Sequence, residues 1–193
     1  MSHNKWKKEI CTIPNLLSLF RIALIPVYGN LYLNADRDID YLLAGSVLAL
    51  SCLTDLADGI IAREFHMISH VGKVLDPLAD KLTQFFLILF LAKKYSQLYP
   101  LLSLFVVKEL FQLGAMVRFI RQGKVLPGAL YAGKLCTAML FVSLSVLVLF
   151  PRLDKTFVFL LISLDTALLF YAFFNYLLAY FGKNTKLTDL ESE

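Results

Sequence analysis

The amino-acid sequence predicts an all-α integral membrane protein with six transmembrane helices and a short N-terminal interfacial helix. Of the 193 residues, 58% are hydrophobic and only 18% are charged, and the mean hydropathy is +0.66. Soluble domains are roughly 45–50% apolar and about 25% charged. The apolar residues here form blocks of about 20, the length of a helix that crosses a hydrocarbon core about 30 Å thick. Barrel strands would alternate over about 10 residues, and these blocks do not.

The N-terminal segment, residues 1–12, predicts an amphipathic helix at the membrane surface. Trp6 favours the level of the lipid headgroups, and the lysines on either side of it favour anionic lipid. No small-residue cleavage site follows the first apolar block, so we expect this segment to be retained and not removed as a signal peptide. A membrane domain is then expected over 13–182, followed by a polar cytoplasmic tail over 183–193.

Six apolar blocks predict the membrane spans. Polar segments or segments with Gly and Pro separate the blocks, such as ADRDID before the second and RFIRQGKVLPG before the fifth. Only helices and closed barrels satisfy their backbone groups in lipid, so each block is expected to be a helix. The expected spans are 14–34, 41–61, 72–92, 98–117, 130–150 and 156–181.

Lysine and arginine residues predict the orientation in the membrane. They are more frequent at the N-terminus, in the loops at 62–73 and 118–129 and in the C-terminal tail than in the loops between them. Cytoplasmic loops carry an excess of these residues. We therefore expect a multi-pass protein of the cell membrane with both termini and the 62–73 loop in the cytoplasm. The positive residues are spread over segment ends and form no stripe that would bind nucleic acid.

Four aspartates at the cytoplasmic ends of the second and third spans form the candidate site. Asp55 and Asp58 are three residues apart, and Asp76 and Asp80 are four apart, so each pair lies on one helix face. Carboxylates this close to lipid repel each other and lose solvation, so they need a cation. Mg²⁺ and Mn²⁺ suit an all-oxygen site. The alternative, solvated loop charges with a turn at Asp58-Gly59, does not explain two same-face pairs flanked by apolar residues.

The residues around these aspartates resemble a known signature. The segments DLADGIIAR and GKVLDPLAD are separated by eight residues. Together they are similar to the DxxDGxxAR(x8)GxxxDxxxD motif of CDP-alcohol phosphatidyltransferases. The segment IPNLLSLFR near the N-terminus also resembles the start of that family, so the resemblance covers nearly the whole chain. The matching positions are Asp55, Asp58, Gly59, Ala62, Arg63, Gly72, Asp76 and Asp80.

This resemblance implies a six-helix homodimer in the membrane lipids, with a polar cavity open to the cytosol and to lipid. It implies two divalent ions, Mg²⁺ or Mn²⁺, held on the pyrophosphate by Asp55, Asp58 and Asp76. Asp80 is implied to help hold metal or to accept the proton of the attacking alcohol. The implied CDP-binding residues are Asp58, Gly59, Ala62, Arg63 and Gly72.

The implied activity belongs to phospholipid biosynthesis. A phosphatidyl group moves from CDP-diacylglycerol to an alcohol, and CMP is released. The residue types agree with this chemistry, because charge builds on phosphoryl oxygens during attack at the β-phosphorus, and metal ions held by carboxylates stabilise such charge. The small residues of the motif leave room for the nucleotide to approach the backbone.

Cations near the site predict the acceptor alcohol. Lys134, in the segment GKLCT, resembles the GKxxT element of the family's phosphatidylglycerophosphate synthases, and Lys108-Glu109 falls where these show Arg-Glu. A further arginine of theirs is Met116 here, with Arg118 two positions on. We expect Lys108, Arg118 and Lys134 to bind the acceptor, because an acceptor that carries phosphate needs fixed cations near the metal site. The favoured acceptor is glycerol 3-phosphate. Arg21, Arg121 and Lys124 lie on the same predicted cytoplasmic half.

Several alternatives stay open at this point. The acceptor could be phosphatidylglycerol, as in a cardiolipin synthase of this family. Lys108 and Glu109 could form a structural pair, and Arg118 could anchor its loop at anionic headgroups. A small ion or solute transporter also holds intramembrane carboxylates, although it would tend to show broken helices or repeated halves. Asp165, in the sixth span, is expected to satisfy a contact between helices.

Overall fold

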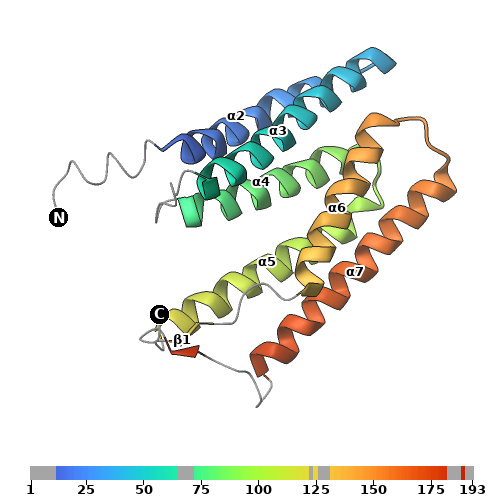
Figure 1. The fold of residues 1–193 in the computed structure, drawn as a ribbon. Helices are drawn as coiled ribbons and strands as arrows, with labels where there is room; N and C mark the ends of the chain where they lie inside the picture. The colour runs from blue at the N-terminus through green and yellow to red at the C-terminus, as the bar shows by residue number, and fades with distance from the viewer. Residues whose placement is uncertain (1–11, 65–71, 122–123, 126–130, 182–187, 190–193) are drawn as a thin grey trace. The chain divides into compact units, whose positions relative to one another are not determined.

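A computed structural model describes residues 12–64, 72–121, 124–125, 131–181 and 188–189 of the chain. The helices in these ranges are α2 (Ile13–Leu33), α3 (Asp38–Glu64), α4 (Gly72–Ala92), α5 (Leu98–Arg121), α6 (Tyr131–Leu149) and α7 (Lys155–Phe181) (Figure 1). Two short strands, β1 (Lys124–Val125) and β2 (Thr188–Asp189), pair antiparallel. The described chain is thus helical apart from this pair. The predicted interfacial helix lies outside the described residues.

Each predicted span corresponds to one helix, and α3 and α5 extend beyond the expected ends by more than one residue. α3 begins at Asp38, three residues before the predicted start. The backbone N–H of Arg37 donates to Asp40 Oδ2 at 2.9 Å, and this local hydrogen bond stabilises the first turn. α5 continues to Arg121, and its last turn carries two arginines, whose charge is favourable at a helix C-terminus.

The chain forms two compact units. The first contains residues 1–94 and 145–152, and the second contains residues 95–144 and 153–193. α6 therefore contributes its longer part to the second unit and its final residues to the first. Each unit is described on its own below.

In the first unit, α2 packs along both α3 and α4 (Figure 1). Part of its contact with α4 is built from aromatic rings. Tyr28 stacks on Tyr32 with ring centroids 5.7 Å apart, and it lies 6.0 Å from the ring of Phe90. Gly29 is buried in the same contact. A Cβ atom at this glycine would lie 2.6 Å from Cε2 and Cζ of Phe90. The missing side chain therefore allows α2 and α4 to approach each other closely.

Gly29→Ala should destabilise the protein by about 1–3 kcal/mol, because the added methyl group overpacks the contact with Phe90. The neighbouring ring of Tyr28 restricts how far Phe90 can move. The matched control is Gly114→Ala on α5, where a Cβ atom would meet nothing within 4 Å. Thermal unfolding of both purified variants in detergent tests this expectation. An unchanged midpoint for Gly29→Ala would contradict it, whereas Gly114→Ala should be neutral or slightly stabilising.

In the second unit, α5 packs on α7. Phe111 of α5 contacts two rings of α7, with centroids 5.6 Å from Phe173 and 5.4 Å from Tyr180. α6 joins α7 through a polar contact, because Ser143 Oγ donates a hydrogen bond of 3.1 Å to Asp165 Oδ1 and both residues are buried. The prediction that Asp165 satisfies a contact between helices is confirmed.

Three helices in the described part of the chain are long and apolar enough to cross a membrane. They comprise Ile13–Leu33 in α2, Leu98–Arg118 in α5 and Lys155–Leu178 in α7, and α6 contains a shorter apolar stretch. Large apolar side chains on α5 and α7 are exposed, among them Leu110 and Phe170. Exposed apolar surface on this scale indicates contact with lipid or another protein. The helices thus have the character expected of a membrane protein.

Candidate active site

The structure brings three of the predicted aspartates against helix α2. Asp55 lies on α3, and Asp76 and Asp80 lie in the first part of α4. Arg21 of α2 contacts two of these carboxylates: its Nη2 lies 2.5 Å from Asp55 Oδ1, and its Nη1 donates to Asp80 Oδ1. Ser18 Oγ donates to Asp76 Oδ1. We call these five residues the carboxylate site.

The spacing of residues on two helices explains this arrangement. Ser18 and Arg21 are three residues apart on α2, so they lie on the same face, one turn apart. Asp76 and Asp80 are likewise separated by one turn on α4. Two helices packed along each other can therefore make two polar contacts, one turn apart. Asp55 on α3 reaches the same guanidinium, so Arg21 joins three helices.

Burial in the carboxylate site is asymmetric. The side chain of Arg21 is 3% exposed, whereas those of Asp55 and Asp80 are 45% and 51% exposed. The guanidinium is thus enclosed by protein, and its charge is neutralised by the two carboxylates, as a buried cation requires. The carboxylates remain open on their other side. Their exposed oxygens are accessible to a ligand on that side.

The donor set of this site fits a hard divalent cation. Asp55, Asp76 and Asp80 offer carboxylate oxygens, the ligand type that Mg²⁺ and Mn²⁺ prefer. Among the described side chains, no three His, Cys, Asp or Glu residues converge as a ready set of metal ligands. Arg21 bonds to two of the three candidate carboxylates. The described site is therefore an acidic cluster held by an arginine, with carboxylate surface open to a cation.

The remaining residues of the motif are placed by their backbone alone. Gly72 is the buried first residue of α4. The other four lie in the last part of α3, after Asp55, and their side chains are outside the described part of the structure. They are Asp58, Gly59, Ala62 and Arg63.

The predicted acceptor residues belong to the second unit. Lys108 is buried, its Nζ lies 2.6 Å from Glu109 Oε1, and it lies 5.9 Å from the ring centroid of Tyr176. This is the ion pair that the sequence left open as an alternative. Arg118 is exposed near the end of α5, with its guanidinium 5.9 Å from the ring centroid of Tyr180. The side chain of Lys134, on α6, is outside the described part.

The partners of the aspartates were not predicted from the sequence. Arg21 was expected among the cations available to an acceptor, and Ser18 was not predicted to belong to the site. One signal was present, because an arginine within an apolar span is costly unless it faces a partner inside the protein. Because Ser18 and Arg21 are three residues apart and share one helix face, the sequence would then have predicted that both side chains face the same neighbouring helix.

Comparison with known proteins agrees with the family resemblance of the aspartate motif. A family model described as CDP-alcohol phosphatidyltransferase matches residues 11–178. The CDP-diacylglycerol–glycerol-3-phosphate 3-phosphatidyltransferase of Rickettsia bellii is 33% identical over 138 residues, covering 71% of this chain and 75% of that protein. The protein of the same name from Aquifex aeolicus is 36% identical over 138 residues, covering 70% and 73%.

A second group of relatives has a different name. The cardiolipin synthase (CMP-forming) of Rattus norvegicus is 43% identical over 112 residues, which cover 57% of this chain. The match covers 35% of the rat protein. The chain therefore spans little more than a third of that relative.

Proposed function

Because this chain belongs to the CDP-alcohol phosphatidyltransferase family, we propose that it transfers a phosphatidyl group from CDP-diacylglycerol to an alcohol and releases CMP. The observation that carries this proposal is the carboxylate site. Asp55, Asp76 and Asp80 come from two helices and gather on one side of α2, with Asp55 and Asp80 half exposed. These are positions of the family motif. Their open carboxylates can hold the divalent ions that a negatively charged pyrophosphate substrate requires.

The proposed roles follow the chemistry of each side chain. Asp55, Asp58, Asp76 and Asp80 would hold two divalent ions, Mg²⁺ or Mn²⁺. Such ions supply positive charge that stabilises the phosphoryl oxygens of the substrate. In a second role, Asp80 accepts the hydroxyl proton of the alcohol. The alcohol oxygen then forms a bond to the β-phosphorus, and the bond from this phosphorus to the oxygen of CMP breaks.

The nucleotide would be bound by the last part of α3 and the start of α4. Gly59, Ala62 and Gly72 lack bulky side chains, so the cytidine can approach the backbone closely. Arg63 would contact the phosphates, because its planar guanidinium can bind two phosphate oxygens at once. Asp58, in the same helical turn as Gly59, would also take part in binding CDP.

Glycerol 3-phosphate is the proposed acceptor. Support comes from the relatives of Rickettsia bellii and Aquifex aeolicus, whose names specify this acceptor and which align over about 70% of this chain. The acceptor roles of Lys108, Arg118 and Lys134 stay predictions. The pair of Lys108 with Glu109 favours a structural role for this lysine, so Arg118 and Lys134 are the stronger candidates to bind the acceptor's phosphate.

Cardiolipin synthesis, with phosphatidylglycerol as acceptor, is the second candidate function. One observation favours it: the rat cardiolipin synthase has the higher identity, 43%, although over a shorter segment. A transporter is disfavoured by the match to the transferase family over residues 11–178.

We also propose that all six helices cross the membrane, with both termini and the carboxylate site in the cytoplasm. The shortest, α6, has 19 residues, close to the roughly 20 needed for a span. Residues 13–182 would form one membrane domain between the amphipathic segment 1–12 and the polar tail 183–193. We further propose that two copies of the protein form a homodimer.

Release of CMP tests the function directly. Purified full-length protein is incubated with CDP-diacylglycerol, Mg²⁺ and one acceptor at a time: glycerol 3-phosphate, phosphatidylglycerol, serine or inositol phosphate. We expect CMP release with glycerol 3-phosphate. Release with phosphatidylglycerol alone would assign cardiolipin synthesis instead. No release with any acceptor would contradict the transferase function.

A further inference from the structure

We propose that Arg21 is an internal counter-ion of the carboxylate site. It holds Asp55 and Asp80 together when no divalent ion is bound, and it yields at least one carboxylate oxygen when an ion binds. The proposal rests on the proposed function in one respect only, that the ion is Mg²⁺ or Mn²⁺. It makes Arg21 a positioning residue that sets how tightly the site binds metal.

The first argument is the connection that Arg21 makes between helices. Its two terminal nitrogens contact carboxylates on different helices, Nη2 that of Asp55 on α3 and Nη1 that of Asp80 on α4. A guanidinium has donors in a fixed planar fork, so it can hold two carboxylates in a defined relation. Ser18 adds a hydrogen bond to Asp76 on the same side of α2. The residues of α2 thus order carboxylates that would otherwise repel each other.

The second argument is the asymmetric burial. Arg21 is enclosed, whereas Asp55 and Asp80 are about half exposed. An incoming cation therefore reaches the carboxylates from their open side, while the arginine stays behind them. Two cations on opposite sides of the same carboxylates repel each other and compete for the same oxygens. Arg21 should consequently weaken metal binding while it stabilises the metal-free protein.

This competition predicts opposite effects on stability and metal affinity. Removing the positive charge takes away the ion pairs of Arg21 with Asp55 and Asp80, so the metal-free protein should unfold more easily. The same change removes a repulsion, so a divalent ion should bind more tightly. If Arg21 had a merely structural role, its removal would lower both stability and metal affinity, because the ligands would lose their positions.

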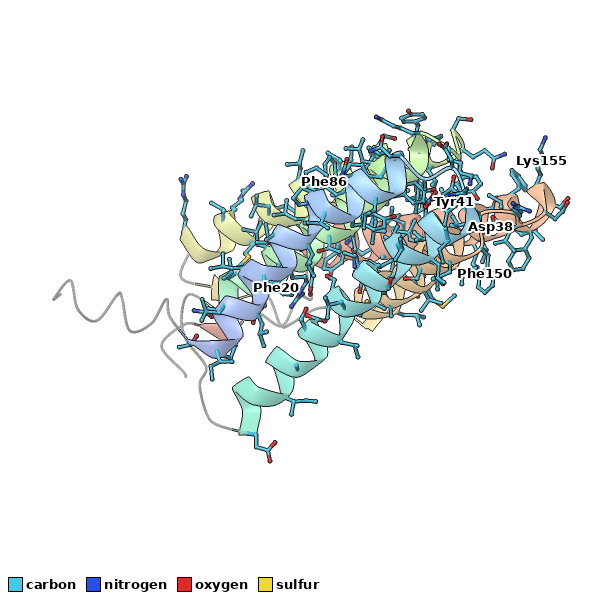
Figure 2. The ribbon with its side chains drawn as sticks, turned by 90° about the horizontal axis from the view of Figure 1, so that it is seen from above. Phe20, Asp38, Tyr41, Phe86, Phe150 and Lys155 are labelled. Atoms are coloured by element: carbon cyan, nitrogen blue, oxygen red, sulfur yellow. The ribbon has the colours of Figure 1, made fainter. Side chains whose placement is uncertain are left out.

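The test compares Arg21→Met, Arg21→Lys and a matched control in the full-length protein in detergent. Free Mn²⁺ is measured by electron paramagnetic resonance during a titration without any CDP-lipid, and thermal unfolding is followed with and without Mn²⁺. The control is Arg152→Met, because Arg152 pairs with Asp38 at 3.0 Å in an exposed ion pair of the same unit. Figure 2 shows Asp38 at the start of α3, with Tyr41 nearby.

For Arg21→Met we expect a metal-free unfolding midpoint lower by at least about 3 °C. We also expect a Mn²⁺ dissociation constant roughly tenfold smaller, equivalent to about 1.4 kcal/mol. Arg21→Lys keeps the charge and should bind Mn²⁺ as the unaltered protein does. Arg152→Met should change neither quantity. Weaker or unchanged Mn²⁺ binding in Arg21→Met would overturn the proposal, as would an unaltered protein that binds no Mn²⁺.

Folding of the variant is itself informative. If Arg21→Met is recovered folded only when Mn²⁺ is present, the ion has replaced the missing charge, and the proposal is supported. If it folds neither with nor without Mn²⁺, the proposal is overturned. Because the titration uses Mn²⁺ alone, its result is independent of CMP release. A protein that shows the expected binding pattern but releases no CMP would contradict the proposed function and leave the counter-ion role standing.

Discussion

Asp80→Asn should reduce CMP release by roughly 10²–10⁴-fold, the contribution of a positioned general base. Asparagine keeps the shape of the side chain, but its amide cannot accept the proton of the attacking alcohol. The side chain of Asp80 is 51% exposed, so an acceptor hydroxyl can reach it. Arg21 still contacts Asp55 in this variant, and the fold should therefore survive.

The measurement is kcat with saturating CDP-diacylglycerol and acceptor, together with the unfolding midpoint of each protein. Asp38→Asn is the matched control, because Asp38 is an exposed residue in the first turn of α3 and is distant in sequence from the motif. Full turnover by Asp80→Asn would show that the base assignment is wrong. A loss of Mn²⁺ binding along with turnover would assign Asp80 chiefly as a metal ligand.

Removal of divalent ions with EDTA should abolish CMP release, with a loss of about 10²-fold or more. The physical reason is charge. Asp55, Asp76 and Asp80 are acidic, and the pyrophosphate of CDP-diacylglycerol is also negative, so the two repel each other unless cations lie between them. Arg21 is enclosed behind the carboxylates, with a side chain only 3% exposed, and cannot serve as that cation.

Mg²⁺ or Mn²⁺ added in excess of the chelator should restore the activity. The unfolding midpoint supplies the control, because Arg21 should keep the metal-free protein folded during the treatment. Activity that persists in EDTA after prolonged dialysis would contradict a divalent-ion requirement. Activity that does not return, with an unchanged midpoint, would contradict reversible binding of the ions at half-exposed carboxylates.

Helix positions were largely predictable from the sequence, whereas some ends and one pairing were not. Apolar blocks of membrane-spanning length locate the six helices, because in lipid the backbone must satisfy its own hydrogen bonds. The start of α3 depends on a hydrogen bond between the backbone of Arg37 and the side chain of Asp40. The pairing of Lys124 with Asp189 joins residues far apart in the chain, and two-residue strands carry no periodic pattern.

The carboxylate site was likewise predictable from the sequence only in part. The motif identified Asp55, Asp76 and Asp80 because their spacing sets them on helix faces, and spacing along one helix is a local property. The sequence by itself also determined the family and the class of chemistry. Only the tertiary structure decided that Ser18 and Arg21 contact these carboxylates, because the partner of a side chain depends on how one helix is rotated against another. That rotation follows from the packing of whole helix faces, such as Gly29 against Phe90, and not from any single residue.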